Sequence, residues 1–141
     1  MTNEQLAWAA GFFDGEGYVS IVARNTKGNS KQYRHQYIRI GINHVDPRPL
    51  QKFQQLFGGQ LTESKQVIGN RKPRWQWILT CEQAKQFLTI VRPYLINKDI
   101  VADIAFQFLD TIGLTGQRIS VEKQQIRHDC ASRLKLVNSQ T

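Results

Sequence analysis

The chain has 141 residues, the size of one ordinary domain. Apolar residues make up 40% of it and charged residues 21%, so it can build a core and lacks the composition of a disordered chain. No apolar stretch approaches the roughly 20 residues that cross a bilayer, and the opening MTNEQ is not a signal sequence. We therefore expect a soluble, intracellular protein that is not exported and has no membrane partner.

The positive charge is concentrated in one part of the chain. Nineteen Lys and Arg stand against eleven Asp and Glu, a net charge of +8. Residues 1–17 carry three acids and no base, whereas residues 18–80 carry eleven bases and two acids. This asymmetry favours nucleic acid as the partner, although a basic surface that only improves solubility is the alternative. Cys81 and Cys130 stand alone and predict neither a zinc site nor a disulfide framework.

The chain begins with a predicted helix and a hairpin. Residues 2–14 predict the helix, because Thr2 and Gln5 can form a capping box ahead of apolar residues at helical spacing. Residues 18–25 and 33–43 alternate with period two, which is typical of antiparallel strands with one buried face.

The same pattern then occurs a second time. Asp46 and Pro47 begin a helix that ends at Gly58-Gly59, and residues 60–66 and 73–80 predict another hairpin.

Three further helices complete the chain. One begins at Thr80 with Gln83 and stops at Arg92-Pro93, one is capped by Asn97, and one runs from Ser120 to about residue 137. Helix-strand-strand units that occur twice predict an antiparallel four-stranded sheet, with helices on one face and a charged concave face left bare.

Residues 9–17, AAGFFDGEG, break the local rules for a helix. Ala7, Gly11 and Gly15 are four residues apart and form a stripe, although each Gly costs about 1 kcal/mol relative to Ala in a helix interior. A stripe of small residues suits the close approach of another helix, whereas a glycine cap with a contact inside the chain is the alternative.

Two acids also stand where the helix should end. Asp14 and Glu16 oppose the helix dipole and require compensation. Between Gly15 and Gly17, Glu16 can leave the helix and offer the hard oxygen that Mg²⁺ prefers, and a solvated acid in a Gly-rich turn is the alternative.

This segment resembles the signature of the LAGLIDADG homing endonucleases. The order of helices and strands and the stretch PYLINK, residues 93–98, are also similar, so the resemblance covers about residues 5–112. It implies an α+β protein with the αββαββα LAGLIDADG fold, a four-stranded antiparallel DNA-binding sheet and extra C-terminal helices. We expect one domain over residues 1–141, with its core at 5–112 and a C-terminal helical region at 113–141.

The resemblance implies a site-specific homing endonuclease that hydrolyses double-stranded DNA across the minor groove of a long, near-palindromic target. Members of this family are encoded in introns or inteins, so we expect an organelle (chloroplast or mitochondrion) or a prokaryotic cytoplasm as the setting. Members with one motif are homodimers, which places Ala7, Gly11 and Gly15 in a dimer interface. Mg²⁺ is the expected cofactor, with Mn²⁺ as a substitute. The alternatives are an RNA maturase that assists intron splicing and a non-cleaving DNA-binding regulator.

The resemblance also assigns candidate catalytic residues. The last acid of the motif falls on Glu16, a metal ligand together with the carbonyl of Gly15. His44 stands where relatives often have Gln, either to order water or to accept a proton, and Arg48 has the spacing of a base that contacts phosphate. Lys98 matches the family's basic residue near the scissile phosphate, and its place in a first helical turn, unfavourable for a cation, also points to a bound anion.

The outward faces of the two hairpins are expected to read DNA. A ten-residue strand spans about 33 Å, close to ten base pairs, and a two-stranded ribbon fits a major groove about 12 Å wide. The expected DNA-binding residues are Ser20, Val22, Arg24, Thr26, His35, Tyr37, Arg39, Thr62, Ser64, Gln66, Arg74 and Gln76. The inward set is Val19, Ile21, Ala23, Ile38, Ile40, Ile42, Trp75 and Trp77.

Overall fold

The computed structural model describes residues 1–24, 35–64, 69, 73–112 and 120–139. Its elements are α1 (Asn3–Glu16), β1 (Gly17–Arg24), β2 (His35–His44), α2 (Pro47–Phe57), β3 (Gln60–Ser64), β4 (Arg74–Thr80), α3 (Cys81–Val91), the 3-10 turn η1 (Arg92–Tyr94), α4 (Asp99–Leu109) and α5 (Val121–Ser139). This order confirms the α+β fold that the sequence predicts. Among the described residues, no helix has both the length and the apolar character to cross a bilayer.

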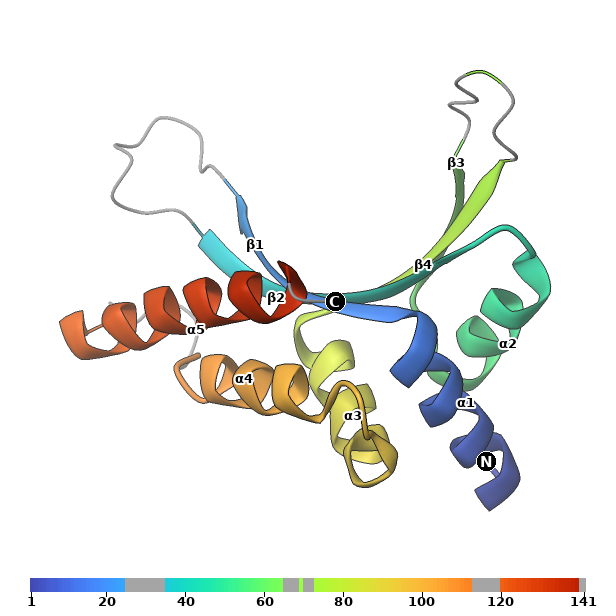
Figure 1. Cartoon of the computed structure of the whole chain (residues 1–141), viewed down its shortest axis with the longest axis horizontal. Coiled ribbons are helices and arrows are strands. Elements are labelled where there is room, and N and C mark those ends of the chain that lie inside the picture. The colour runs from blue at the N-terminus through green and yellow to red at the C-terminus, as the bar shows by residue number, and fades with distance from the viewer. Residues whose placement is uncertain (25–34, 65–68, 70–72, 113–119, 140–141) are drawn as a thin grey trace.

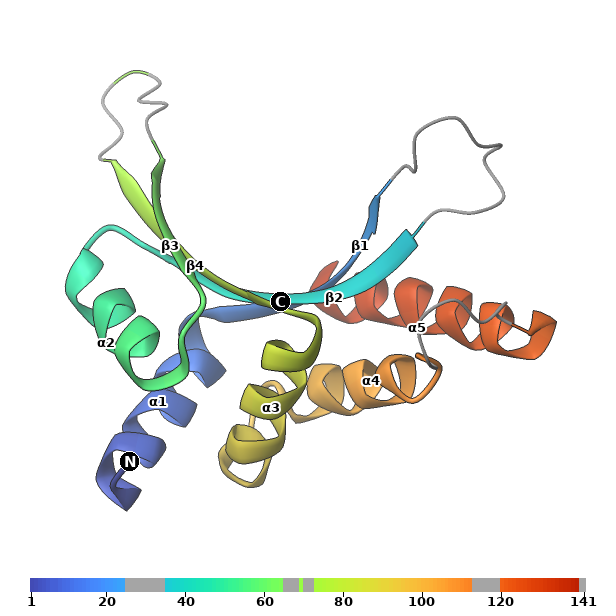
Figure 2. The same cartoon turned by 180° about the vertical axis from the view of Figure 1, so that it is seen from behind.

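The four strands form one antiparallel sheet in the spatial order β1-β2-β4-β3. Ser20 lies opposite Arg39 across β1 and β2, and Gln76 of β4 lies opposite both Asn43 of β2 and Thr62 of β3. Directly opposed residues of antiparallel strands point to the same face, so these side chains share one face of the sheet. The helices all lie on the other side, and the sheet curves so that the uncovered face is concave (Figures 1 and 2). We call this uncovered side the bare face.

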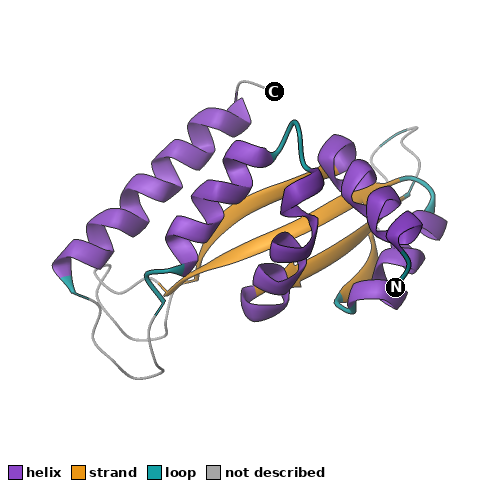
Figure 3. Ribbon diagram, turned by 90° about the horizontal axis from the view of Figure 1, so that it is seen from below, coloured by secondary structure: helices purple, strands orange, loops and turns teal. Residues whose placement is uncertain are grey.

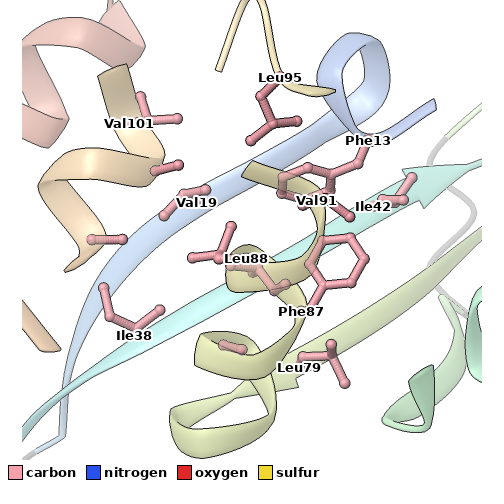
Figure 4. Packing of buried hydrophobic residues seen from close by; sticks show 14 of the residues in the cluster. Phe13, Val19, Ile38, Ile42, Leu79, Phe87, Leu88, Val91, Leu95 and Val101 are labelled. Atoms are coloured by element: carbon pink, nitrogen blue, oxygen red, sulfur yellow. The ribbon is translucent and has the colours of Figure 1, made fainter. Parts of the chain in front are cut away.

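The opposite face of the sheet carries the core. Phe13 of α1 packs edge-on against Phe87 of α3, with ring centroids 5.0 Å apart. Val91 and Leu95 lie beside these rings, while Val19 of β1 lies farther along the same layer (Figure 4). Complete burial of a large apolar side chain contributes about 1.5–3 kcal/mol, so this layer holds the helices against the sheet.

Helix α5 packs along α4 and against β1, an edge strand of the sheet (Figure 3). The Nδ2 group of Asn138 donates to the carbonyl of Val19 at 3.2 Å. Nearer the start of α5, buried Arg127 donates to the hydroxyl and the carbonyl of Thr111, at 2.7 and 3.1 Å. These contacts fasten the C-terminal helix to the end of α4 and to the sheet edge, which sheet proteins commonly cover against pairing with other chains.

Several predicted helix ends are confirmed by their hydrogen bonds. The Thr2 and Gln5 side chains form the predicted capping box at the start of α1. Asp46 accepts the Arg48 backbone N–H at 3.0 Å as the cap of α2, and Ser120 accepts the Lys123 backbone N–H at 3.2 Å. The cap chemistry at these positions is local, which explains why the sequence shows it.

Thr80 is the N-cap of α3, as predicted, but its side chain makes no cap bond, and the next residue, Cys81, has a φ of 54°. Two predictions at helix ends were wrong. Helix α1 continues to Glu16 instead of ending at residue 14. Lys98, not Asn97, is the N-cap of α4, because the Asn97 side chain donates to α1 instead.

Phe53 of α2 tests the assignment of the core. Its ring is fully buried, with its centroid 4.8 Å from that of Trp77 and 5.2 Å from that of Trp8. Phe53→Ala should lower the free energy of unfolding by about 3–5 kcal/mol, because it leaves a cavity in the aromatic cluster. Urea denaturation measures the loss. Tyr94→Ala, at a side chain that is 47% exposed, is the control and should change it by less than about 0.5 kcal/mol; equal losses would place Phe53 outside the core.

Candidate active site

The C-terminal end of α1 meets the N-terminal end of α4 through one side chain. The Asp14 carboxylate accepts the backbone N–H groups of Ile96, Asn97 and Lys98, with shortest distances of 3.2, 2.9 and 2.8 Å. These amides lead into α4, where the first N–H groups of a helix have no partner within the helix. The acid that opposes the dipole of its own helix therefore stabilises the start of another.

Lys98 makes the reciprocal contact. Its Nζ donates to the carbonyl oxygen of Asp14 at 2.9 Å, and the Nδ2 of Asn97 donates to the same oxygen at 3.3 Å. A cation is unfavourable at the start of α4 but favourable at the carbonyl end of α1, where this ammonium lies. We call Asp14, Asn97 and Lys98 the helix-end clasp. The end of α1 thus compensates the charge of Lys98, and contact of Lys98 with a bound anion stays a prediction.

The clasp shifts the pKa values of both charged groups. Partial burial raises the pKa of Asp14, but the backbone N–H groups of Asn97, Lys98 and Ile96 and the Lys98 charge outweigh it, so the pKa lies below its usual value of 3.8. Burial lowers the pKa of Lys98 below 10.5, and the carboxylates of Asp14 and Glu16 oppose this shift. Because the Nζ of Lys98 bonds to the carbonyl of Asp14, two residues before Glu16, these two candidate residues both lie at the last turn of α1.

Glu16 is exposed and is the last residue of α1, so its carboxylate is accessible at the end of the helix. Gly15 lies in the same last turn, where backbone carbonyls have no helical partner. The described part of the chain contains no cluster of three His, Cys, Asp or Glu side chains that would enclose a metal ion. An exposed carboxylate beside a carbonyl nevertheless fits Mg²⁺, which commonly binds one or two protein carboxylates and completes its shell with water and substrate phosphate.

His44 is the last residue of β2 and lies near the start of α2. Its Nδ1 accepts the Asp46 backbone N–H at 3.0 Å, and its ring packs against Phe12 of α1 with centroids 5.6 Å apart. Gly17 lies opposite Ile42 in the β1–β2 register, so Glu16 and His44 both lie just beyond this pair, at the same end of the two strands.

Arg48 lies in the first turn of α2, with 84% of its side chain exposed. Its guanidinium binds the Asp46 carboxylate, with Nη2 at 2.6 Å from Oδ2 and Nε at 3.1 and 3.0 Å from the two oxygens. The Arg48 side chain lowers the pKa of Asp46 to about 2. Since exposed ion pairs contribute little stability, Arg48 can exchange this carboxylate for another anion.

The sheet register places the predicted DNA-reading residues on the bare face. Those described there are Ser20, Val22, Arg24, His35, Tyr37, Arg39, Thr62, Ser64, Arg74 and Gln76, whereas Thr26 and Gln66 lie outside the described residues. Of the predicted inward set, Ala23 is exposed near the end of β1. Contact of the bare-face residues with DNA remains a prediction.

Two of these residues are less accessible to a DNA base than the period-two pattern indicates. Tyr37 is only 8% exposed, and its hydroxyl accepts from Nη2 of Arg39 at 3.2 Å. The Nε of Arg39 is buried and has no hydrogen-bond partner among the described residues. Both side chains line a hollow of about 370 Å³ between β2, β4 and the start of α3. Arg39 must therefore leave Tyr37 before it can read a base edge.

Sequence reasoning missed Tyr18 and Asn43, which the register also places on the bare face. The hydroxyl of Tyr18 accepts from Nε2 of Gln76 at 3.1 Å, a bond between β1 and β4 across β2. Extending the alternation by one step from Ser20 and by two steps from Arg39 would have found both residues.

The small-residue stripe of α1 faces away from the rest of the chain. Ala7, Gly11 and Gly15 are exposed, and a Cβ atom added at either glycine would meet no heavy atom of the described structure within 4 Å. Trp8, next to the stripe, is 39% exposed. A close contact within the chain therefore does not explain these glycines.

The Asp46 carboxylate gives a prediction on pH. Its folded-state pKa of about 2 lies below its ordinary value of 3.8, so its stabilising effect is present above pH 3.8 and is lost as the pH falls toward 2. Asp46→Asn keeps an oxygen for the cap but removes the charge. The native protein should be more stable than this variant at pH 6, and the difference should shrink between pH 4 and 2, measured by urea denaturation. A constant difference would show that Asp46 is not held by Arg48.

The comparisons with known proteins agree with this geometry. A family model described as LAGLIDADG endonuclease matches residues 9–113. No curated protein matches the sequence significantly. The structure is similar to that of the archaeal intron-encoded homing endonuclease I-Vdi141I complexed with DNA, with 12% identity over 96% of this chain and 84% of that one and a TM-score of 0.77.

Two further homing endonucleases have TM-scores of 0.71. I-CvuI, solved with its target in the presence of Ca, is 14% identical over 95% of this chain and 82% of that one. I-TnaI is 18% identical over 96% of both chains. At these low identities the structural likeness establishes the fold alone. The family model covers most of the sequence. The chain belongs to the LAGLIDADG endonuclease family.

Proposed function

We propose that this protein is a site-specific, metal-dependent endonuclease for double-stranded DNA that acts as a homodimer and is encoded in an intron or intein. The observation that carries the proposal is the end of α1, where exposed Glu16 interacts with the charge of Lys98 and borders the bare face. A carboxylate for a hard cation and an ammonium for a phosphate are the groups that phosphodiester hydrolysis needs.

The substrate class follows from the bare face. This face is concave and carries Arg39 and Arg74 among polar side chains, and the stretches that follow β1 and β3 in the sequence are basic. Arg and Gln side chains can form paired hydrogen bonds with guanine and adenine in a major groove. The similar proteins I-Vdi141I and I-CvuI are homing endonucleases solved with DNA, which supports duplex DNA as the ligand.

Glu16 and the Gly15 carbonyl are the groups that would hold Mg²⁺, with Mn²⁺ as a substitute. Bound there, the metal would neutralise charge on the scissile phosphate and favour ionisation of water at the site. The structures of I-CvuI with Ca and with Mg support a divalent cation in the family. We also propose that the scissile phosphates of the two DNA strands face each other across the minor groove.

The remaining candidate residues act on water and phosphate. Nδ1 of His44 is engaged by Asp46, which leaves Nε2 as the ring nitrogen that can contact water. Lys98 supplies positive charge for the pentavalent phosphorus, and Arg48 exchanges Asp46 for a phosphate oxygen.

The stripe of α1 supports the proposed homodimer. The chain has one AAGFFDGEG segment, and Gly11 and Gly15 have open space around them. Two copies of α1 that cross at this stripe would bring two Glu16 residues near a two-fold axis, and a symmetric protein of this kind fits a near-palindromic target.

Glu16→Gln tests the assigned site. The variant keeps the size of the side chain but removes the charge that holds the metal, so cleavage should fall by at least about 10²-fold while metal-free DNA binding changes little. The target is first selected from a randomised duplex library, then cleavage is measured on gels and binding by mobility shift. Glu4→Gln, another exposed acid of α1, is the matched control. Undiminished cleavage by Glu16→Gln would refute the site, and tight binding to RNA without cleavage of any duplex would favour a maturase.

Gly11→Leu tests the dimer separately from the fold. The added side chain enters open space within one chain and improves helix propensity by up to about 1 kcal/mol, so the protomer should stay folded. It should, however, separate two crossing helices and give a monomer in sedimentation. Gln86→Leu, at an exposed position of α3, places an exposed leucine outside the stripe and should remain dimeric. An unchanged sedimentation coefficient for Gly11→Leu would exclude this interface.

A further inference from the structure

We propose that Asp14 is a positioning residue of this endonuclease, which fixes the ammonium of Lys98 beside Glu16 through the helix-end clasp. The inference rests on the proposed function, because it concerns how the candidate catalytic groups are held. Asp14 is not itself a candidate to touch metal or phosphate. Its carboxylate is already occupied by backbone amides of the segment before α4.

One residue holds Lys98 at both ends. The Asp14 carboxylate accepts the Lys98 backbone N–H at 2.8 Å, and the Asp14 carbonyl accepts its Nζ at 2.9 Å. A free lysine side chain samples many rotamers, whereas a side chain with its backbone and its ammonium bonded to one residue is restricted to few. Preorganised charges stabilise a transition state without reorganising during the reaction, so this restriction matters for catalysis.

Both terminal oxygens of Asp14 face backbone N–H donors. Oδ1 accepts from Ile96, Asn97 and Lys98 at 2.8–3.2 Å, and Oδ2 lies 3.3 and 3.0 Å from the amides of Ile96 and Asn97. Asparagine has the same shape, but its amide group would point N–H donors at N–H donors. Asp14→Asn therefore disrupts the clasp with almost no change in volume.

The helix-end clasp can be disturbed without separating α1 from the start of α4. Phe13 is fully buried against Phe87, and Leu95, just before the clasp segment, is buried in the same layer (Figure 4). These apolar contacts anchor α1 and the start of α4 independently of Asp14. A role confined to the helix cap would thus change stability alone, whereas a positioning role also changes the rate of the chemical step.

The first measurement uses metal-free protein and no DNA. In Asp14→Asn, the amide resonances of Ile96, Asn97 and Lys98 should shift, and their protection from hydrogen exchange should fall by at least about tenfold, relative to the native protein. Amides of Ala105 and Phe106, in the second turn of α4, serve as internal references and should keep their protection. Unchanged resonances at residues 96–98 would overturn the clasp.

The second measurement is single-turnover cleavage of the selected duplex at saturating protein. Asp14→Asn should cleave at least about tenfold more slowly, while its DNA affinity in Ca²⁺ stays within threefold of the native value. Asp103→Asn removes an equal charge from the exposed pair with Arg92 and should cleave at the native rate. Native-rate cleavage by Asp14→Asn, with its amides already perturbed, would reduce Asp14 to a structural cap and overturn the proposal.

The third measurement asks whether Asp14 acts through Lys98. Lys98→Met is combined with Asp14→Asn, and the double variant should cleave no more than about threefold more slowly than Lys98→Met alone, because coupled residues are not additive. Multiplicative losses would overturn the proposal. Should Asp14→Asn fail to fold, Asp14→Glu keeps the charge but moves the carboxylate by one methylene, and the same rates and resonances are measured on it. Failure of the native protein to cleave any duplex would refute the proposed function, and full cleavage by Glu16→Gln would refute the assigned site. Loss of cleavage in Glu16→Gln, with native cleavage and an intact Lys98 amide in Asp14→Asn, would refute only the positioning role.

Discussion

The exchange of charge between two helix ends determines how this site is built. Asp14 is unfavourable at the end of its own helix, and Lys98 is unfavourable at the start of α4. Each becomes favourable because its charged group lies against the opposite helix end, the carboxylate on the amides before α4 and the ammonium on the last turn of α1. The contact orients two helix axes relative to each other and fixes where Glu16 emerges. The neighbouring aromatic layer around Phe13 contributes the packing energy, whereas the clasp sets the orientation of α1 relative to α4.

The sheet has a complementary role, since it keeps the bare face separate from the core. Alternation along β1, β2 and β4 sends apolar side chains to the helices and polar ones outward, and the cross-strand bond from Gln76 to Tyr18 connects the outward groups over three strands. Helix α5 covers the side of β1, and Asn138 bonds directly to that strand. The uncovered face of this sheet is concave (Figure 1), and Glu16 and His44 both lie just beyond the Gly17–Ile42 pair of β1 and β2.

Features that depend on neighbours in sequence could be predicted. Period two gave the two faces of each hairpin, and the caps at Thr2 and Asp46 gave two helix starts, because their bonds span two or three residues. The clasp could not be predicted in this way, since its partners are 82–84 positions apart. Local rules therefore marked Asp14 and Lys98 as anomalies and assigned Asn97 to a cap that it does not make. Burial of Tyr37 was missed for a similar reason, because its hollow is lined by three different segments.

In a single chain, the Glu16 carboxylate and the glycines of α1 lack binding partners among the described residues. Glu16 is exposed in a described structure that offers no enclosed metal cluster, and Gly11 and Gly15 leave open space along the same helix. In the proposed homodimer these two features require each other. Helices that approach closely enough to use the glycines bring two Glu16 carboxylates together, where like charges repel unless a cation lies between them. A bound metal ion would then relieve a repulsion that dimerisation creates, which couples assembly to catalysis at one point of the fold.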